Sequence, residues 1–202
     1  TEATREIADP DFELLGTNAV ATCSAIAVEG GVTLTTTTGS GDQVIVVPHL
    51  DASQSAWGTV TWGTDQETEW ECFLKTAASI ADIVIWAGLK LTNTSVTATD
   101  AGQAFFRYAP ATASGDWEAI NSIAGVDVET DTGIAVAAST KYHLRITIDS
   151  ARLARFYING QLVGTSAALA AGDFIPYIGV QTSTTAAKAL QVYGQAISRI
   201  AA

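Results

Sequence analysis

A short turn at Asn159-Gly160 constrains the fold of this chain more than any other stretch of its sequence. Asn and Gly readily adopt the positive φ angles of a type I′ turn, and the twist of that turn matches the twist of paired antiparallel strands. Strand-forming residues flank the turn on both sides, in the sequence ARFYINGQLVGTS. The turn therefore predicts a β-hairpin between residues 153–158 and residues 161–165.

The segment before the hairpin alternates between apolar and polar residues. In residues 141–149, KYHLRITID, the apolar side chains share one face, and the polar ones, His143 among them, share the other. A period of two is typical of a half-buried strand. A turn within residues 147–153 then leads into the hairpin, so residues 142–165 predict a three-stranded meander.

Strand-like runs fill most of the remaining chain. They cover residues 20–28, 32–36, 43–47, 68–74, 82–89, 103–108, 174–180 and 190–200, and clusters of Gly, Asn, Asp, Ser and Thr separate them. Many strands with turn signals between them are typical of an antiparallel β-sandwich or jelly roll. We therefore expect an all-β chain with a sandwich domain at residues 17–202, preceded by an extended N-terminal arm at residues 1–16.

The charge of the chain restricts its partners. Ten Lys and Arg stand against 21 Asp and Glu, which gives a formal net charge of -11 and a pI near 4.4. An acidic protein repels phosphate backbones and anionic lipid surfaces, so neither nucleic acid nor a membrane is an expected partner. The first sixteen residues also lack the basic region and apolar stretch of a secretory signal. We therefore expect synthesis and retention in a cytoplasm.

Three closely spaced glutamates are the strongest candidates for catalytic residues. Glu67, Glu69 and Glu71 alternate along one predicted strand, so neighbouring carboxylates would stand roughly 7 Å apart, near the separation that glycosidases use. General-acid catalysis requires one carboxyl group with a perturbed pKa, and no apolar neighbour on this face would perturb it. The pattern favours a solvated outer face, and we expect no catalytic residue in the chain.

Metal-binding motifs are weak in this sequence. His49 and His143 lack partners at the spacing of a zinc site. The segments TATDAG (residues 97–102) and VDVETDTG (residues 126–133) offer oxygen ligands for calcium, but neither fits a 12-residue EF-hand loop. We expect solvated loop acids there, with calcium as the alternative, and no cofactor.

The two cysteines and the serines give no stronger indication of chemistry. Cys23 and Cys72 are expected to be buried thiols, although a single bridge between them stays open, because two cysteines do not make a disulfide framework. The G-x-S-x-G motif of a serine hydrolase is absent, and ASGDWE (residues 113–118) is expected to form a turn before a Trp.

The large aromatic residues allow two interpretations. Trp57, Trp62, Trp86 and Trp117 with Tyr108 would form a stacking platform for sugar rings if they lay side by side in solvent. Aromatic residues in a sandwich of this size more often belong to the core. The exposure of these side chains distinguishes a lectin-like protein from a scaffold.

The order of segments in the second half of the chain resembles a known family. KYHLRITID, then ARFYINGQLVGTS, IPYIGVQT and KALQVYGQAISRI resemble the C-terminal half of concanavalin A-like (laminin G-like) jelly-roll domains. The segments FELLGTNAVAT, GVTLTTTTGSGDQVIVVP and residues 70–89, which begin WECFLKT and end IWAGL, resemble the N-terminal half seen in virion structural proteins of tailed phages. The resemblance covers residues 12–202 and implies a jelly roll. The fold itself is compatible with lectins, glycosidases, peptide-binding modules and inert shell proteins.

Taken with the resemblance, these patterns predict a non-enzymatic phage virion protein, a capsid decoration or cement protein or a related head or tail component. Such a protein would be made in the host cytoplasm, bind a major capsid protein, and form a homo-oligomer, most simply a trimer. Phe12, Leu14 and Leu15 in the N-terminal arm are the expected interface residues, unless the arm folds back as a strand on its own sandwich. A carbohydrate-binding module, with a host glycan as its ligand, is the alternative; a glycosidase is a third and weaker one.

Overall fold

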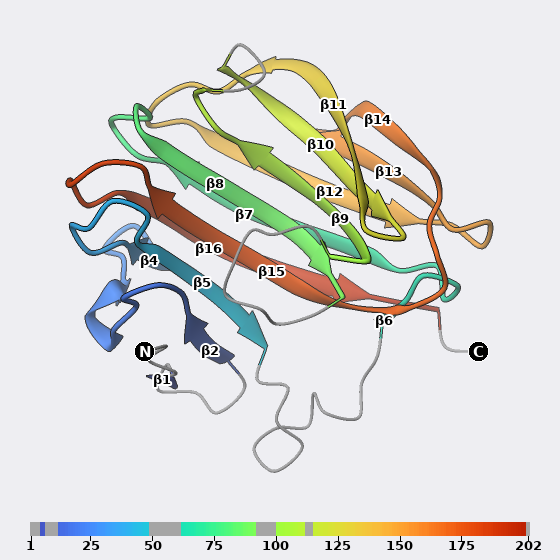
Figure 1. The fold of residues 1–202 in the computed structure, drawn as a ribbon, viewed down its shortest axis with the longest axis horizontal. Helices are drawn as coiled ribbons and strands as arrows, with labels where there is room; N and C mark the ends of the chain where they lie inside the picture. Colours follow the sequence, from blue (N-terminus) through green and yellow to red (C-terminus); the bar gives the residue numbers. More distant parts are fainter. Residues whose placement is uncertain (1–4, 7–11, 49–61, 92–99, 112–114, 201–202) are drawn as a thin grey trace.

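The computed structural model describes residues 5–6, 12–48, 62–91, 100–111 and 115–200. In this part of the chain two antiparallel sheets lie face to face, and the only helix is a 3-10 turn at Ala21–Cys23 (Figure 1). The prediction of an all-β antiparallel sandwich is therefore confirmed. No helix of the described residues is long and apolar enough to cross a membrane.

The larger sheet has nine strands in the order β1-β2-β5-β15-β8-β9-β10-β11, with β6 also paired to β15. Their bounds are β1 Arg5–Glu6, β2 Phe12–Leu15, β5 Gln43–Pro48, β6 Trp62–Gly63, β8 Ile83–Lys90, β9 Gly102–Tyr108, β10 Asp116–Ile123, β11 Val126–Ala135 and β15 Asp173–Thr182.

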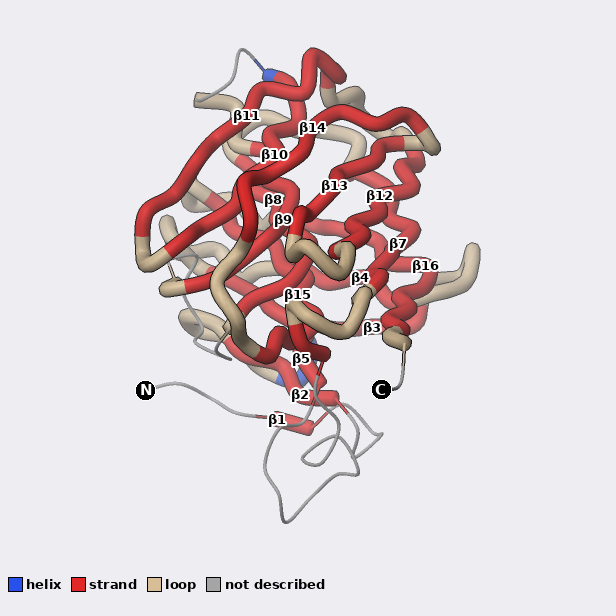
Figure 2. The backbone as a smooth tube through the Cα atoms, turned by 90° about the vertical axis from the view of Figure 1, so that its right-hand side faces the viewer, coloured by secondary structure: helices blue, strands red, loops and turns tan. Residues whose placement is uncertain are grey.

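The smaller sheet has seven strands in the order β14-β13-β12-β7-β16-β4-β3. Their bounds are β3 Ser24–Ile26, β4 Val32–Thr35, β7 Glu69–Thr76, β12 Lys141–Ile148, β13 Leu153–Ile158, β14 Gln161–Ala168 and β16 Ala189–Ser198. The last strands of the two sheets, β11 and β14, lie side by side at one end of the molecule (Figure 2).

The hairpin and the meander form as the sequence predicts. Asn159 and Gly160 have φ angles of 51° and 84°, the two positive values that a type I′ turn requires. β12, β13 and β14 are neighbours in the smaller sheet, and the apolar residues of β12 face the core. Local turn chemistry and a period of two were sufficient to predict this unit.

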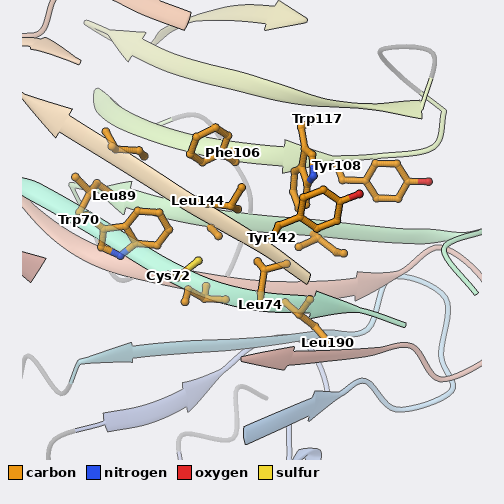
Figure 3. Packing of buried hydrophobic residues seen from close by; sticks show 14 of the residues in the cluster. Trp70, Cys72, Leu74, Leu89, Phe106, Tyr108, Trp117, Tyr142, Leu144 and Leu190 are labelled. Atoms are coloured by element: carbon orange, nitrogen blue, oxygen red, sulfur yellow. The ribbon is translucent and has the colours of Figure 1, made fainter. Parts of the chain in front are cut away.

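The main core lies between the sheets and is rich in aromatic residues at the end formed by β9, β10 and β12. Trp117 packs edge-on against Tyr142, with ring centroids 5.4 Å apart, and Tyr108 contacts the same indole (Figure 3). Phe106 and Phe156 make a second edge-on pair across the sandwich, 5.5 Å apart. Such pairs add to the burial of apolar area that stabilises the sandwich.

The larger sheet is buried on its outer face as well. Trp86 and Tyr177 are almost fully buried there, together with Leu15, Ile45, Val47, Phe105 and Ile120. Gly179 makes this packing possible, because a Cβ atom at that position would lie 2.6 Å from the indole ring of Trp86. The ring therefore lies directly against the backbone of β15.

Two strands were not predicted. Residues 116–123 and 126–135, in which a turn before a Trp and a loop of solvated acids were expected, pair as β10 and β11. Asp127 lies in β11 and accepts hydrogen bonds from Gln103 and Ser122. The connecting turn uses Ala124 and Gly125 at positive φ, and Ala is an unusual residue for that conformation, so the hairpin gave no clear signal. Residues 20–28 were likewise not one strand, since a 3-10 turn precedes β3.

The N-terminal segment supplies a strand of the larger sheet. Phe12–Leu15 pairs with Gln43–Pro48, and the side chains of Leu14 and Leu15 are buried within this chain. This is the strand folded back on its own sandwich, the alternative that the sequence left open. No partner is needed to cover Leu14 and Leu15; a docking role for Phe12, Leu14 and Leu15 stays a prediction.

Candidate functional site

The outer surface of the smaller sheet carries the polar and aromatic residues that point away from the core. Because alternate residues of a strand face opposite sides, β7 presents its odd-numbered residues 69–75 to solvent, and β12 presents its odd-numbered residues 141–147. β7 pairs with β12 on one side and with β16 on the other. These three strands form the floor of the surface described below.

A ring stack occupies the middle of this surface. Phe73 and His143 are direct cross-strand partners, and their rings are parallel within 8°, with centroids 4.2 Å apart. Phe73 is 47% exposed, which is high for a large apolar side chain. On the opposite side Phe73 is paired with Gly194 of β16, and no atom lies within 4 Å of the position that a Cβ at Gly194 would take. The stack therefore stands next to open space.

Ion pairs hold the polar side chains around the stack. His143 Nε2 lies 2.8 Å from an oxygen of Glu71, and Arg145 lies 3.4 Å from Glu69. The guanidinium of Arg145 also covers the ring of Tyr157, 4.3 Å from its centroid. Each of these side chains is only partly exposed and is fixed by a neighbour on the adjacent strand, so the surface is ordered before any ligand binds.

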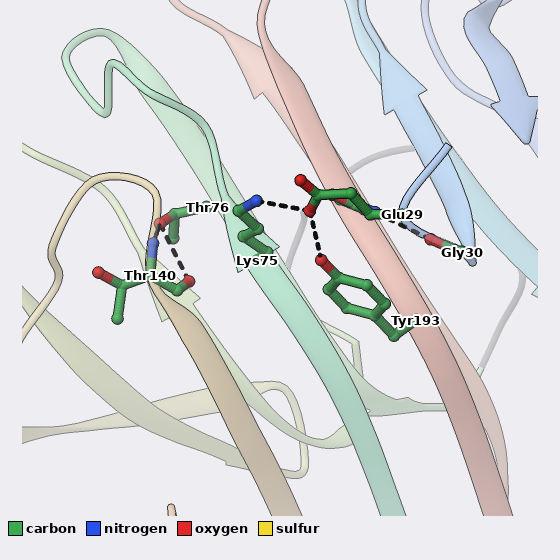
Figure 4. A network of polar contacts seen from close by, with 7 residues as sticks. Glu29, Gly30, Lys75, Thr76, Thr140 and Tyr193 are labelled. Carbon is green, nitrogen blue, oxygen red and sulfur yellow. Dashed lines mark hydrogen bonds and ion pairs between the residues drawn. The ribbon is translucent and has the colours of Figure 1, made fainter. Parts of the chain in front are cut away.

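A second polar group lies beside β16. Lys75 donates a hydrogen bond of 2.8 Å to Glu29, and the hydroxyl of Tyr193 donates one of 3.2 Å to the same carboxylate oxygen (Figure 4). The hydrogen bond from Lys75 lowers the pKa of Glu29, and the same bond raises the pKa of Lys75. The ammonium of Lys141 lies over the ring of Tyr193, 4.3 Å from its centroid.

Together these elements form an open groove of about 370 Å³, which we call the outer groove. It is lined by Phe73, Leu74, Lys141, Tyr142, His143, Asn159 and Tyr193. Asn159, the first residue of the type I′ turn, closes one end and accepts a hydrogen bond of 2.9 Å from the backbone N–H of His143. The turn that shapes the hairpin thus also positions a side-chain amide in the groove.

The groove combines the groups by which proteins recognise a sugar. Aromatic rings offer apolar surface to the C–H face of a pyranose, and fixed amide, imidazole and ammonium groups offer hydrogen bonds to its hydroxyls or to a carboxylate. Phe73 and Tyr193 supply the rings, while Lys141, His143 and Asn159 supply the polar groups.

The glutamates predicted to lie on a solvated face do so in part. Glu69 and Glu71 are half-exposed on β7, where each has a cationic or histidine partner. Glu67 is not on the strand; it precedes β7 and has a positive φ of 49°. The three carboxylates therefore do not form the regular row that the sequence predicted.

The structure decides between the two interpretations of the large aromatic residues in favour of the core. Trp62, Trp86, Trp117 and Tyr108 are all buried, with exposed fractions of 4% or less, because they pack in the core or on the outer face of the larger sheet. Trp57 lies outside the described residues, as does His49. The exposed aromatic surface instead comes from Phe73, with Tyr193 partly exposed on the neighbouring strand β16 and Tyr157 partly exposed on β13.

The thiols and the acidic residues give no metal site in the described part of the chain. Cys23 and Cys72 are both buried and are not bridged, as the interpretation of two apolar thiols expects. Burial raises the pKa of Cys72 and keeps it a neutral thiol. No group of three or more His, Cys, Asp or Glu among the described residues is arranged to hold a metal ion.

Sequence reasoning missed most of the groove. The alternation in residues 68–74 already places Phe73 on the same face as Glu69 and Glu71, and an aromatic residue on a polar face was the available signal. Its contact with His143, seventy residues later in the chain, depends on cross-strand register. No local pattern encodes that register.

Comparison with known proteins identifies the architecture but no family. No protein-family model matches the chain, and no curated protein matches it either. Among solved structures, the family 7 alginate lyase A1-II' is similar with a TM-score of 0.64 and 15% identity, over 90% of this chain and 85% of that one.

Two similar structures are described as carbohydrate-binding. The module CBM66 from Bacillus subtilis has a TM-score of 0.56 and 10% identity, over 92% of this chain and 94% of that one. The carbohydrate recognition domain of Emp47p has a TM-score of 0.61 and 9% identity, over 95% and 89%. The fold is thus an all-β jelly-roll sandwich of the concanavalin A-like kind, as the sequence predicted.

The predicted role is not supported by the same comparisons. The expectation of a non-enzymatic phage virion protein is wrong, because the similar structures are alginate lyases and carbohydrate-binding domains. The prediction transferred a function from fold-level likeness, and this fold carries many functions. The carbohydrate-binding alternative agrees better with these structures.

Proposed function

We propose that this domain binds a polysaccharide chain in the outer groove of its smaller sheet. The observation that carries the proposal is the exposed Phe73, held flat against His143 beside Lys141, Asn159 and Tyr193 in a groove of about 370 Å³. An aromatic ring that is fixed, half in solvent and surrounded by polar groups offers a stacking surface at little cost in side-chain entropy.

The local charges allow both neutral and acidic sugars. The net charge of -11 disfavours a polyanion at long range, but salt screens that repulsion beyond roughly 8 Å at physiological ionic strength. Within the groove the exposed Lys141 provides a cation for a uronate carboxylate. The similar alginate lyases and carbohydrate-binding domains support a polysaccharide as the class of ligand.

Affinity electrophoresis through gels that contain a neutral glucan, a fructan or a uronate polysaccharide tests the proposal. At least one polymer should retard the wild type, and Phe73→Ala should migrate as in a gel without polymer. Leu162→Ala, which removes a similarly exposed apolar side chain from β14, is the matched control and should be retarded as the wild type is. Equal retardation of all three proteins would refute binding in the outer groove.

A second candidate function, polysaccharide lyase activity, is favoured by the pair formed by His143 and Glu71. Elimination from a uronate requires a base for the carbon-bound proton, a group that stabilises the charge developing on the carboxylate, and an acid for the leaving oxygen. His143, oriented by Glu71 at 2.8 Å, suits the base, and Lys141 suits the carboxylate. The hydroxyl of Tyr193 is the nearby acid in this scheme.

The two candidates differ in one measurement. Elimination creates a carbon–carbon double bond conjugated to the carboxylate, so a lyase produces a rising ultraviolet absorbance from a uronate polysaccharide. That increase should disappear in His143→Ala, in which binding in the gel should weaken, because His143 supports Phe73, but should not be lost entirely. If the wild type is retarded by the polymer but no absorbance develops, the domain binds without cleaving.

A further inference from the structure

A second groove lies on the outer surface of the smaller sheet, beyond the outer groove. Its volume is about 350 Å³, and we call it the far groove. It shares no lining residue with the outer groove, but it is built on the same three strands, β7, β12 and β16. The polar side chains in its lining include those of Glu67, Glu69, Thr147, Asp149, Ser198 and Arg199.

Cross-strand register places the two grooves in line. Three rows of residues run across β12, β7 and β16: His143, Phe73 and Gly194; Arg145, Glu71 and Ala196; and Thr147, Glu69 and Ser198. The first row contains Phe73 and His143 of the outer groove, and the third row lies in the far groove. Because residues on one face of a strand are two apart, the first and third rows stand about 13 Å from each other.

No bulky side chain of β16 separates the two grooves. Gly194, Ala196 and Ser198 are exposed, and each has a short side chain or none. On the side away from β7, β4 pairs with β16 only from Ala189 to Val192, so none of the described strands flanks this part of β16. A polymer that leaves the outer groove past Gly194 therefore meets only short side chains along β16 on its way to the far groove.

Neighbouring residues hold the carboxylates of the far groove in place. Arg145 lies 3.4 Å from Glu69, and Arg155 lies 2.8 Å from Asp149. The hydrogen bond from the backbone N–H of Leu153, together with Arg155, lowers the pKa of Asp149 and keeps it ionised at neutral pH. The far groove is therefore ordered before a ligand binds, as the outer groove is.

The two grooves differ in charge. The lining of the outer groove includes Lys141 and no carboxylate. The lining of the far groove has one guanidinium, from Arg199, and three carboxylates, from Glu67, Glu69 and Asp149. Ionised carboxylates accept hydrogen bonds from hydroxyl groups and repel another carboxylate. The far groove therefore favours a sugar unit that carries hydroxyls and no acid group.

We infer that the far groove is a second subsite for the same polysaccharide, about 13 Å from the outer groove, and that it takes a neutral sugar unit. The inference rests on the proposed binding in the outer groove. The hydroxyls of Thr147 and Ser198 and the carboxylate of Glu69 contact the hydroxyls of that unit. Because one sheet fixes both subsites, a chain that is held in the first binds in the second without a further loss of translational freedom.

Calorimetric titration with fragments of increasing length tests the inference, using glucan, fructan and uronate fragments from disaccharide to octasaccharide. For a neutral polymer the affinity should rise once when the fragment fills the outer groove. It should rise again, by about tenfold, when the fragment is long enough to reach the far groove. Uronate fragments of the same lengths should lack the second rise, because the carboxylates of the far groove oppose it.

Two substitutions in the far groove separate the subsites. Thr147→Val keeps the shape of the side chain and removes its hydroxyl, and Ser198→Leu fills part of the groove. Each should lower the affinity for the longest neutral fragment by about fivefold and leave the affinity for the shortest binding fragment unchanged. Thr130→Leu, at an exposed position of β11 in the larger sheet, is the matched control and should change neither affinity.

The outcomes distinguish this inference from the proposed function. A long neutral fragment that binds no more tightly than a short one would overturn the inference alone, as would a second rise that both variants retain. An equal second rise for the uronate fragments would contradict the neutral unit. If no fragment of any length binds, the proposed function fails together with the inference.

Discussion

Phe73 of β7 and His143 of β12 are direct cross-strand partners whose rings stack 4.2 Å apart at the centre of an exposed polar surface. In an ordinary half-buried sheet the outer positions carry polar or charged side chains, as Glu69 and Glu71 do on the same strand. The stack places apolar surface where solvation alone would disfavour it. The proposed binding of a polysaccharide would use this exposed ring as its stacking surface.

Phe73→Ala should remove binding while largely preserving the fold. The substitution loses one aromatic contact with His143 and little buried area, so the free energy of unfolding should fall by less than about 1.5 kcal/mol. Affinity for the retarding polysaccharide should fall at least tenfold, measured by calorimetric titration. Loss of the cooperative unfolding transition would show instead that Phe73 supports the fold.

Gly160→Val should destabilise the hairpin. Gly160 has a φ of 84°, which a β-branched residue adopts at a cost of about 1–2 kcal/mol. Gln161→Val, one residue later and exposed on β14, is the control and should be tolerated because strands accept β-branched residues. Thermal unfolding monitored by circular dichroism measures both, and equal melting temperatures for Gly160→Val and the wild type would contradict the type I′ geometry.

Gly179→Ala should be destabilising for a different reason. The added methyl group would lie 2.6 Å from the ring of Trp86, so the indole or β15 must move, at a cost of about 1–3 kcal/mol. Gly194→Ala adds the same group into open space and should leave the unfolding free energy nearly unchanged.

Replacing Trp86 by Leu provides the test of that contact. In the Trp86→Leu protein, Gly179→Ala should lower the free energy of unfolding by less than it does in the wild type, because the ring atoms that the methyl group would meet are gone. Chemical denaturation of the wild type, the two single variants and the double variant gives the coupling free energy between the two positions. If Gly179→Ala lowers the free energy of unfolding equally in the wild type and in Trp86→Leu, the strain does not arise at Trp86.

Asp42 should make the stability depend on acid pH. Burial alone would raise the pKa of Asp42, but hydrogen bonds from Thr37, Asn18 and the N–H of Gly39 to its carboxylate outweigh burial and lower it. The ionised carboxylate therefore stabilises the fold above its unfolded pKa, about 3.9, and this contribution is lost as the pH falls through the lower folded value.

Asp42→Asn should accordingly lower the free energy of unfolding by about 1–3 kcal/mol at neutral pH. The difference in the free energy of unfolding between wild type and variant should narrow below about pH 3.9, where the carboxyl of the unfolded wild type begins to take up its proton. Urea unfolding at several pH values measures it. A difference independent of pH would contradict a stabilising carboxylate.

The predictable parts of the fold were those that neighbouring residues encode. The alternation of residues 141–149 predicted which face of β12 is buried, and Asn159-Gly160 predicted the turn that follows β13. The turn at Ala124-Gly125 has no such signal, and the acidic residues of β11 were interpreted as a loop. Each turn or strand was predicted correctly only where its own residues favour that conformation.

The candidate site depended on contacts between distant segments. Glu71 and His143 were each identified from sequence, but as unrelated surface residues, because their 2.8 Å contact requires the register between β7 and β12. The large Trp residues were plausible sugar platforms until their burial was known, and Phe73 carried no motif. Exposure and register are properties of the folded sheet, so sequence patterns alone could not assemble the groove.

Resonance mapping of a bound oligosaccharide locates the binding surface on the protein. The backbone amide spectrum of the wild type should be titrated with a short oligosaccharide of the polymer that retards it. We expect saturable shifts centred on Phe73, His143 and Asn159, with further shifts along β16 near Tyr193. Shifts centred on the outer face of the larger sheet around Trp86 and Tyr177, or no saturable shifts with any polymer class, would contradict it.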